Sequence, residues 1–389
     1  MSSHEAWKLV PKARRIVVKI GSSTLTRNGR LRPNKFTALA RDVSRLVENG
    51  HEVVVVSSGA IAVGAHQLGW KNAGETIREK QAAAAVGQIG LIELYQRRFA
   101  RRGIHVGQVL LTRAGLEDRE RFLNARRTML ELLRIGVVPI VNENDTIATE
   151  EIRFGDNDNL AATIVSAIDA DLLVILTDVD GLYERAPEAG KPTPPLIRTV
   201  GKITPAIARA ASGAGTHFGS GGMITKLEAA TSAARCGAAT ILCNGQVGGV
   251  LERLISGQQY GTLFEPGERL KSRKHWLAFT SKTRGAIVID DGASRALTNR
   301  GRSLLPAGIL RVEGRFNVGD TVRCLDGEGQ EVARGLAGYS SLEVEQIAGR
   351  PTKEISQVLG YTNGDEVIHR DDLVLVGPAA TGSPNDEGA

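Results

Sequence analysis

Short apolar runs alternate with helix-length segments through the first two-thirds of this 389-residue chain. Strands that are separated by helices are joined by crossover connections, which favour parallel pairing. Helices then cover both faces of the sheet. The sequence therefore predicts an α/β fold, a mostly parallel open sheet between two helical layers. The predicted strands are residues 15–20, 53–56, 106–111, 137–141, 172–176 and 240–242, and the predicted helices include residues 36–47, 79–99 and 120–133.

Polar residues follow four of these predicted strands, at the point where each strand ends. Ligands in open α/β sheets bind beyond the carboxyl ends of the strands. Four polar strand ends in succession therefore indicate one site, since turns alone would not require them. They are Lys19, Ser57-Ser58-Gly59, residues 142–145 (Asn-Glu-Asn-Asp) and Thr177-Asp178.

A glycine-rich segment, residues 213–222, leads into an alanine-rich predicted helix that carries Lys226 near its start. Backbone N–H groups and the helix dipole at such a point can hold a phosphate. By itself the segment fits a flexible surface loop equally well, and it does not match the Walker A pattern. Lys226, and Lys19 before its own Gly-Ser-Ser turn, favour the phosphate interpretation because each places a positive charge beside a glycine-containing turn.

Residues 154–159, Phe-Gly-Asp-Asn-Asp-Asn, hold more acid and amide groups than one turn or helix cap needs. Asp and Asn are common at turns and N-caps for local reasons, which is the alternative explanation for Asp145, Asp156 and Asp158. Amides also suit the carboxylate and ammonium groups of an amino acid. Lysines, glycine-rich turns and carboxylates together supply what phosphoryl transfer requires, so the segments jointly indicate a kinase.

The composition is that of an ordinary globular protein, with 42% hydrophobic and 24% charged residues. No apolar run approaches the roughly 18 residues of a membrane span and no signal-peptide pattern opens the chain, so we expect a cytoplasmic protein without membrane contact. A formal net charge of +6 would attract an anion, whether ATP, an acidic metabolite or RNA. The three cysteines and the histidines lack metal-ligand spacing, so neither a disulfide framework nor a zinc site is expected.

Near residue 265 the alternation of strands with helix-length segments gives way to short β-like runs. A single core rarely grows beyond about 250–300 residues, so a chain of this length is expected to form two domains. We predict a catalytic domain at 1–265, a linker at 266–283, a mainly β domain at 284–376 and a disordered tail at 377–389. The predicted β runs of the second domain are residues 286–289, 309–312, 321–325, 331–336 and 373–376.

With these motifs in this order, the chain resembles the glutamate 5-kinases, a branch of the amino acid kinase family, over nearly its whole length. The resemblance implies ATP-dependent phosphorylation of L-glutamate to L-glutamyl 5-phosphate, the first step of proline biosynthesis. It also implies Mg²⁺ bound mainly through the ATP phosphates, feedback inhibition by proline, glutamyl phosphate reductase as downstream partner, and a homotetramer or homodimer. The motifs that carry it are residues 81–88 (QAAAAVGQ), 107–113 (GQVLLTR), 118–126 (DRERFLNAR) and 176–183 (LTDVDGLY).

The resemblance implies roles for single residues on the phosphate side. Lys19 and Lys226 would be catalytic, holding the phosphates, and Asp158 would orient both lysines. The family often has Thr where Ser220 stands and a hydroxyl residue where Ile224 stands, which affects at most one side-chain contact. The implied nucleotide site comprises Lys19, Thr177, Asp178, Ser220, Gly221, Gly222, Met223, Ile224, Thr225 and Lys226.

On the acceptor side, the resemblance implies that Ser58, Asp145 and Asn157 bind glutamate, with Asp156 close by. A carboxylate that attacks phosphorus needs no general base. Catalysis would therefore rest on charge neutralisation and in-line positioning.

From residue 284 to about 360 the chain resembles a PUA domain, a small β-barrel type common in RNA-modifying enzymes, through residues 285–293 and 303–309. RNA binding is therefore an alternative function, with Phe316, Tyr339 and Tyr361 as the residues that could stack on bases. A sister amino acid kinase acting on aspartate, acetylglutamate or a nucleotide monophosphate is a second alternative. The 118–126 and 155–159 segments and the attached domain argue against that second one.

Overall fold

The computed structural model describes residues 3–148, 157–187, 190–211, 222–267 and 282–376, and the chain divides into two compact units, residues 1–270 and 271–389. The predicted tail and most of the predicted linker lie outside the described residues, so the finer domain boundaries stay predictions. No described helix is long and apolar enough to cross a bilayer.

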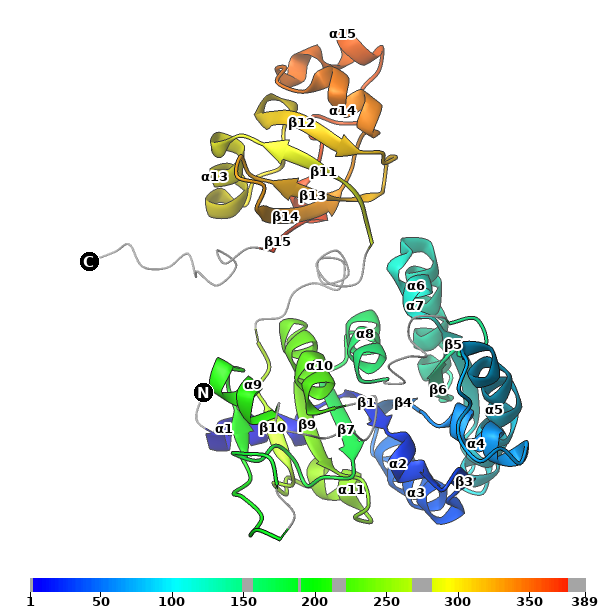
Figure 1. The fold of residues 1–389 in the computed structure, drawn as a ribbon. Helices are drawn as coiled ribbons and strands as arrows, with labels where there is room; N and C mark the ends of the chain where they lie inside the picture. Colours follow the sequence, from blue (N-terminus) through cyan, green and yellow to red (C-terminus); the bar gives the residue numbers. More distant parts are fainter. Residues whose placement is uncertain (1–2, 149–156, 188–189, 212–221, 268–281, 377–389) are drawn as a thin grey trace. The chain divides into compact units, whose positions relative to one another are not determined.

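Strands and helices alternate in the larger unit, as predicted (Figure 1). Its strands are β1 (Arg15–Ile20), β2 (Thr26–Arg27), β3 (Arg30–Leu31), β4 (Glu52–Val56), β5 (Val106–Leu111), β6 (Val138–Glu143), β7 (Leu172–Thr177), β8 (Thr199–Val200), β9 (Ala239–Asn244) and β10 (Thr262–Phe264). Its helices are α1 (Ser3–Trp7), α2 (Ser22–Leu25), α3 (Pro33–Glu48), α4 (Ala60–Gln67), α5 (Ile77–Ala100), α6 (Arg113–Glu117), α7 (Arg119–Arg134), α8 (Asp158–Ile168), α9 (Pro205–Ala211), α10 (Met223–Arg235) and α11 (Val250–Ile255).

An eight-stranded sheet forms the centre of this unit, in the order β5-β6-β4-β1-β7-β9-β10-β8. The first six strands of that order pair in parallel, and β10 runs antiparallel to β9. The predicted mostly parallel sheet is thus confirmed. The short strands β8 and β10 were not predicted, because runs of two and three residues are too short to show an apolar pattern.

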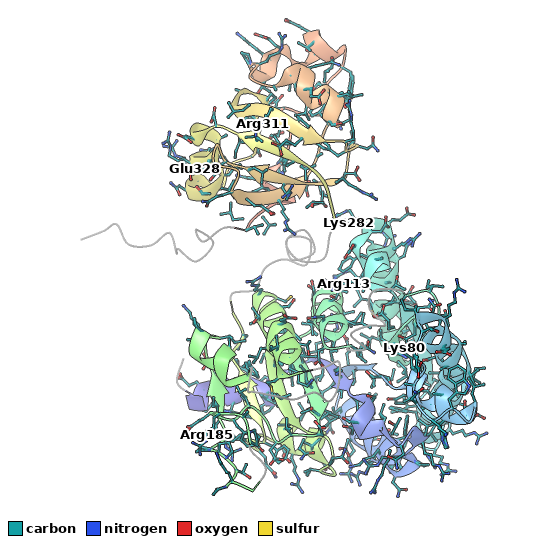
Figure 2. The ribbon with its side chains drawn as sticks, in the orientation of Figure 1. Lys80, Arg113, Arg185, Lys282, Arg311 and Glu328 are labelled. Atoms are coloured by element: carbon teal, nitrogen blue, oxygen red, sulfur yellow. The ribbon has the colours of Figure 1, made fainter. Side chains whose placement is uncertain are left out.

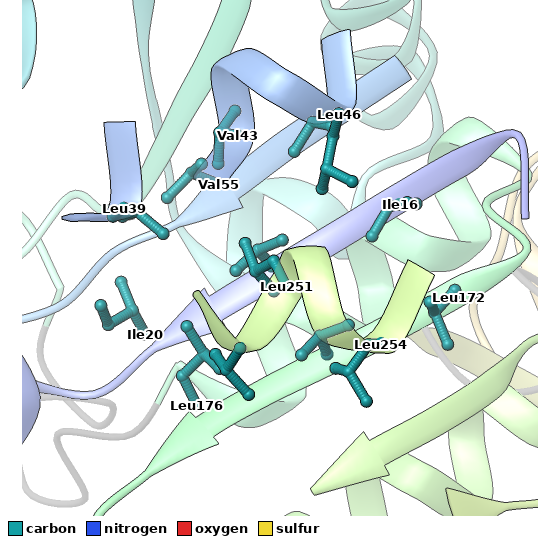
Figure 3. Packing of buried hydrophobic residues seen from close by; sticks show 14 of the residues in the cluster. Ile16, Ile20, Leu39, Val43, Leu46, Val55, Leu172, Leu176, Leu251 and Leu254 are labelled. Atoms are coloured by element: carbon teal, nitrogen blue, oxygen red, sulfur yellow. The ribbon is translucent and has the colours of Figure 1, made fainter. Parts of the chain in front are cut away.

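The strand order brings the predicted polar strand ends together. β6, β4, β1 and β7 are consecutive in the sheet and parallel, so their carboxyl ends share one edge. On one face, α3 and α11 pack over these strands, with Val43 and Leu251 in the same apolar cluster as Ile16 and Leu172 (Figure 3). That buried cluster fixes the strands and leaves their polar ends at the ligand edge.

Helices α4 and α5 cross at two glycines. A Cβ added at Gly87 would lie 2.0 Å from the carbonyl oxygen of Ala60, and one added at Gly64 would lie 1.7 Å from that of Ala83. The two backbones can touch only because neither glycine has a side chain. The crossing therefore sets the position of α4, which begins just beyond the polar end of β4.

The smaller unit has its own five-stranded sheet, in the order β12-β11-β13-β14-β15. β11 pairs in parallel with β13, and the other neighbours are antiparallel. Three helices were not predicted, because segments of 5 to 10 residues with few buried side chains carry little apolar periodicity. The elements are β11 (Thr283–Ile289), α13 (Asp291–Arg300), β12 (Ile309–Gly314), β13 (Thr321–Leu325), β14 (Glu331–Leu336), α14 (Ser341–Ile347), α15 (Ile355–Leu359) and β15 (Leu373–Leu375).

Two of the three aromatic residues considered for base stacking belong to the core of the smaller unit. Phe316 is 3% exposed and Tyr339 is fully buried, whereas Tyr361 is 47% exposed and donates a hydrogen bond to Glu343. A buried ring cannot stack on a base, so the stacking role predicted for Phe316 and Tyr339 is wrong.

We predict that Gly87→Ala lowers the free energy of unfolding by about 2 kcal/mol or more, because overpacking at a backbone contact pushes the two helices apart. Gly90→Ala is the matched control on the same helix, since its added Cβ would meet the end of the flexible Gln67 side chain, 2.9 Å away. Better helix propensity should leave the control unchanged or stabilised by up to about 1 kcal/mol. Urea unfolding followed by circular dichroism measures both variants, and equal midpoints would contradict the prediction.

Candidate functional site

A buried carboxylate joins two lysines at the ligand edge of the larger sheet. Asp158, the first residue of α8, is fully buried, and its Oδ1 lies 2.6 Å from Nζ of Lys19. Its Oδ2 lies 3.0 Å from Nζ of Lys226 and accepts a hydrogen bond from Thr225 Oγ1 at 3.1 Å. The structure thus brings together the three residues that were predicted to be catalytic.

Side-chain alternation along β1 directs Lys19 to this point. Ile16, Val18 and Ile20 belong to the apolar cluster with α3 and α11. Lys19 is offset by one residue, so its side chain leaves the opposite face of the strand. There it meets Asp158 at the start of α8.

Lys226 reaches the same carboxylate from α10. This helix packs against α8, and Lys226 stands three residues after Met223, its first residue. Lys19 and Lys226 are only 5% and 7% exposed, whereas cations such as Arg113 and Arg185 extend from the surface of the unit (Figure 2). Buried lysines with a shared carboxylate are the feature that distinguishes this cluster from surface charge.

The electrostatics of the cluster favour an anion. Burial of Asp158 by itself raises the pKa of the carboxyl, but the charges of Lys19 and Lys226 and the hydrogen bonds they donate outweigh it and hold the pKa below its ordinary value. With one carboxylate against two ammonium groups, the cluster keeps one surplus positive charge. In a poorly solvated site that surplus attracts a phosphate oxygen more strongly than a surface lysine would.

Hydrogen-bonded amides adjoin the ion cluster. Asn157 is 6% exposed, and its Nδ2 donates to the backbone oxygen of Ser57 and, at 2.8 Å, to Oδ1 of Asn142. Nδ2 of Asn142 in turn donates to Oε1 of Gln88, also at 2.8 Å. Because Asn157 and Asp158 are consecutive, these amides and the lysine cluster form one continuous site.

The other predicted acceptor residues lie at the ends of β4 and β6. Ser58 is 8% exposed and directly follows Ser57, whose carbonyl is bonded to Asn157. Asp145 is partly exposed in the turn after β6. Asp156 lies outside the described residues.

The structure describes most of the residues that were predicted to bind the nucleotide. Thr177 is 6% exposed at the end of β7, and its Oγ1 donates to Oδ1 of the exposed Asp178 at 3.1 Å. Gly222 is the N-cap of α10, where Met223 is partly exposed and Ile224 is 51% exposed. Ser220 and Gly221 lie outside the described residues.

Metal binding by protein ligands alone has no support among the described residues, because no group of three His, Cys, Asp or Glu side chains there is placed to hold an ion. Asp158 is already engaged by two ammonium groups. Mg²⁺ commonly binds substrate phosphates with only one or two carboxylates. The described residues are therefore compatible with an ion held mainly by substrate phosphates.

Four residues of the site had been given no role. Asn142 and Ser57 lie within motifs that had been noted, and Gln88 ends the 81–88 segment, so position in a motif could have indicated all three. Tyr95 carried no such signal, although its hydroxyl lies 3.0 Å from Oγ of Ser57 and it is fully buried on α5. A long-range hydrogen bond of this kind becomes visible only in three dimensions.

The sequence is similar to known proteins over nearly its whole length. The sequence matches the model of the amino acid kinase family over residues 14–244 and that of the PUA domain over residues 285–359. A curated glutamate 5-kinase of Methylobacillus flagellatus is 49% identical over 370 residues, covering 95% of this chain and 99% of the relative. The glutamate 5-kinase of Cupriavidus taiwanensis is 50% identical with the same coverage.

We predict that Asp158→Asn destabilises the protein by about 3–5 kcal/mol at neutral pH, because it leaves two buried ammonium groups without a counter-charge. The lowered pKa means that the carboxylate contributes fully above about pH 4 and that this contribution is lost as the pH falls through the lowered pKa. The difference between wild type and variant should therefore be constant from about pH 5 to 8 and shrink below about pH 4.

Urea unfolding across this pH range measures the difference, with Asp178→Asn as an exposed control that should change stability by less than about 0.5 kcal/mol. A difference that grows as the pH falls would contradict the assigned ion pairs.

Proposed function

The chain belongs to the amino acid kinase family and, within it, to the glutamate 5-kinases, and on that premise we propose that it transfers the γ-phosphoryl group of ATP to the γ-carboxylate of L-glutamate. The observation that carries the proposal is the buried Lys19–Asp158–Lys226 cluster directly beside the amide of Asn157. A charge that would suit a phosphate and an amide that would suit an amino acid are thereby adjacent in the sequence and in the site.

The proposed chemistry follows from the charge of the acceptor and from the charged residues on the phosphate side of the site. The attacking γ-carboxylate is already an anion, so no residue needs to remove a proton. Lys19 and Lys226 would neutralise charge on the phosphoryl oxygens, and Asp158 would hold both ammonium groups in a fixed geometry before the substrates arrive. Mg²⁺ would enter with ATP and offset the charge of the β- and γ-phosphates.

Binding of the acceptor would fix the line of attack. Ser58, Asp145 and Asn157 would hold L-glutamate at the ends of β4 and β6 and the start of α8, with Asp156 close by. Thr177, Asp178 and residues 220–226 would hold the nucleotide at the ends of β7 and the start of α10. The acceptor and nucleotide sides meet at Lys19, on the strand between β4 and β7. This arrangement supports in-line transfer without a covalent enzyme intermediate.

The proposal extends to the reaction sequence. The product would be an acyl phosphate, which hydrolyses readily, so a reductase such as glutamyl phosphate reductase would have to consume it promptly. Proline would act as feedback inhibitor at the acceptor site or at a site that overlaps it. Like glutamate, proline carries a carboxylate and an ammonium group on one carbon. We propose a cytoplasmic enzyme of proline biosynthesis that assembles as a homotetramer or homodimer.

ADP release from MgATP tests the proposal, with L-glutamate, L-aspartate, N-acetyl-L-glutamate and uridine monophosphate compared as acceptors. Hydroxylamine in the assay converts an acyl phosphate into a stable hydroxamate. We expect hydroxamate with L-glutamate and its suppression by proline. Activity with another acceptor alone would keep the site but overturn the substrate. No activity with any of them would make RNA binding by the smaller unit the next function to test.

We predict that Lys226→Ala lowers kcat by about 10²- to 10³-fold, as loss of one charge-stabilising donor commonly does. Asp158 keeps its ion pair with Lys19 in this variant, so stability should fall by much less than in Asp158→Asn. Steady-state kinetics and urea unfolding on the same samples measure the two effects. Unchanged kinetics would remove Lys226 from the catalytic site.

We predict that Asp145→Ala raises the KM for L-glutamate by about tenfold or more and leaves the KM for ATP within about twofold, since Asp145 lies on the acceptor side, in the turn after β6. The exposed Asp178, at the end of β7, provides the opposite control, because Asp178→Ala should alter the KM for ATP instead. A selective effect of Asp145→Ala on ATP would show that the two sides are assigned wrongly.

A further inference from the structure

Three amides form a chain from α5 to the start of α8. Gln88 Oε1 accepts from Nδ2 of Asn142, and Oδ1 of Asn142 accepts from Nδ2 of Asn157. Asn157 Nδ2 also donates to the backbone oxygen of Ser57. We refer to the three side chains of Gln88, Asn142 and Asn157 as the amide chain.

The direction of this chain is set at Ser57. A backbone carbonyl can only accept, so the NH₂ group of Asn157 must face Ser57, and its second hydrogen then goes to Asn142. Because Asn157 donates, Asn142 must present its oxygen to Asn157. Its NH₂ group then faces Gln88, and since Asn142 is only 2% exposed, that group bonds inside the protein. Gln88 completes the order by supplying an acceptor, so neither buried amide can flip without breaking a bond.

This fixed order leaves Oδ1 of Asn157 as the atom that can bind a ligand. Both hydrogens of Asn157 are used inside the protein, and among the described residues Oδ1 accepts no hydrogen bond. Asn157 therefore offers a ligand an acceptor and no donor. Of the polar groups on L-glutamate, only the α-ammonium group is a donor, because both carboxylates are acceptors.

We propose that Gln88 is a positioning residue that fixes Asn157 as the acceptor for the α-ammonium group of the substrate, and so sets the preference for a free amino acid. The proposal rests on the function proposed above. Gln88 does not touch the substrate in this account, and it acts through the buried Asn142. Its place is held by Gly87, the preceding residue, whose backbone contacts α4 directly.

Two substitutions separate this role from mere packing. Gln88→Leu keeps the approximate volume and removes the acceptor of Asn142. Asn142 can then turn its NH₂ group toward the NH₂ group of Asn157, so that Asn157 keeps only its bond to Ser57 and is held less firmly. Gln88→Glu keeps an acceptor at the same place and preserves the order of the chain. Gln96→Leu is the matched control, because Gln96 is an exposed glutamine on the same helix.

The readout is the KM for L-glutamate against the competitive inhibition constant of glutarate, which is glutamate without its ammonium group. We expect Gln88→Leu to raise the KM for L-glutamate about tenfold while the inhibition constant of glutarate and the KM for ATP change by less than about twofold. Gln88→Glu and Gln96→Leu should both stay within about threefold of wild type for L-glutamate.

Equal weakening of L-glutamate and glutarate in Gln88→Leu would show a general packing role and overturn the inference, as would an unaffected Gln88→Leu in an active protein. A Gln88→Glu variant as impaired as Gln88→Leu would also overturn it. A wild type without glutamate-dependent ADP release would overturn the proposed function itself, and this inference with it.

Discussion

The two ion pairs of Asp158 are the interaction on which the rest of the site depends. Lys19 and Lys226 come from a strand and a helix about two hundred residues apart, and the buried carboxylate offsets much of the cost of removing both ammonium groups from water. Without it, the strand and the helix would carry repelling charges into one poorly solvated space. With it, the protein holds a surplus positive charge in place before any ligand binds, so little reorganisation is needed during transfer.

The parallel sheet makes this arrangement possible, because it gathers residues distant in sequence at one edge. The acceptor side depends in addition on α5, a helix that reaches the site with two side chains. Gln88 bonds the end of β6 through Asn142, and Tyr95 bonds the end of β4 through Ser57. The positions of the two acceptor-side strand ends are thus coupled to one helix, and the phosphate side is coupled to α8 and α10.

Most of the larger unit could be predicted from the sequence, because apolar strands and amphipathic helices each leave a periodic pattern. Lys19 could be placed at the ligand edge for the same reason, since strand ends of a parallel sheet have a known location, whereas the role of Asp158 was implied only by the family resemblance. The pairing of Asn157 with Asn142 could not, because an amide carries no sign of its partner in sequence. Phe316 and Tyr339 were misjudged because an aromatic residue in a β-rich segment suits a core and a binding surface equally well.

The glycine crossing of α4 and α5 bears on how such a site can evolve. Side chains at the strand ends can be substituted one at a time, so the acceptor preference can change while the sheet and its helices stay the same. The contact of Gly64 and Gly87 allows no such gradual path, since a methyl group on either one would strike the opposing backbone. Selection on substrate choice is therefore expected to act on the loops, while these two positions are kept unchanged by purifying selection although neither would touch a ligand.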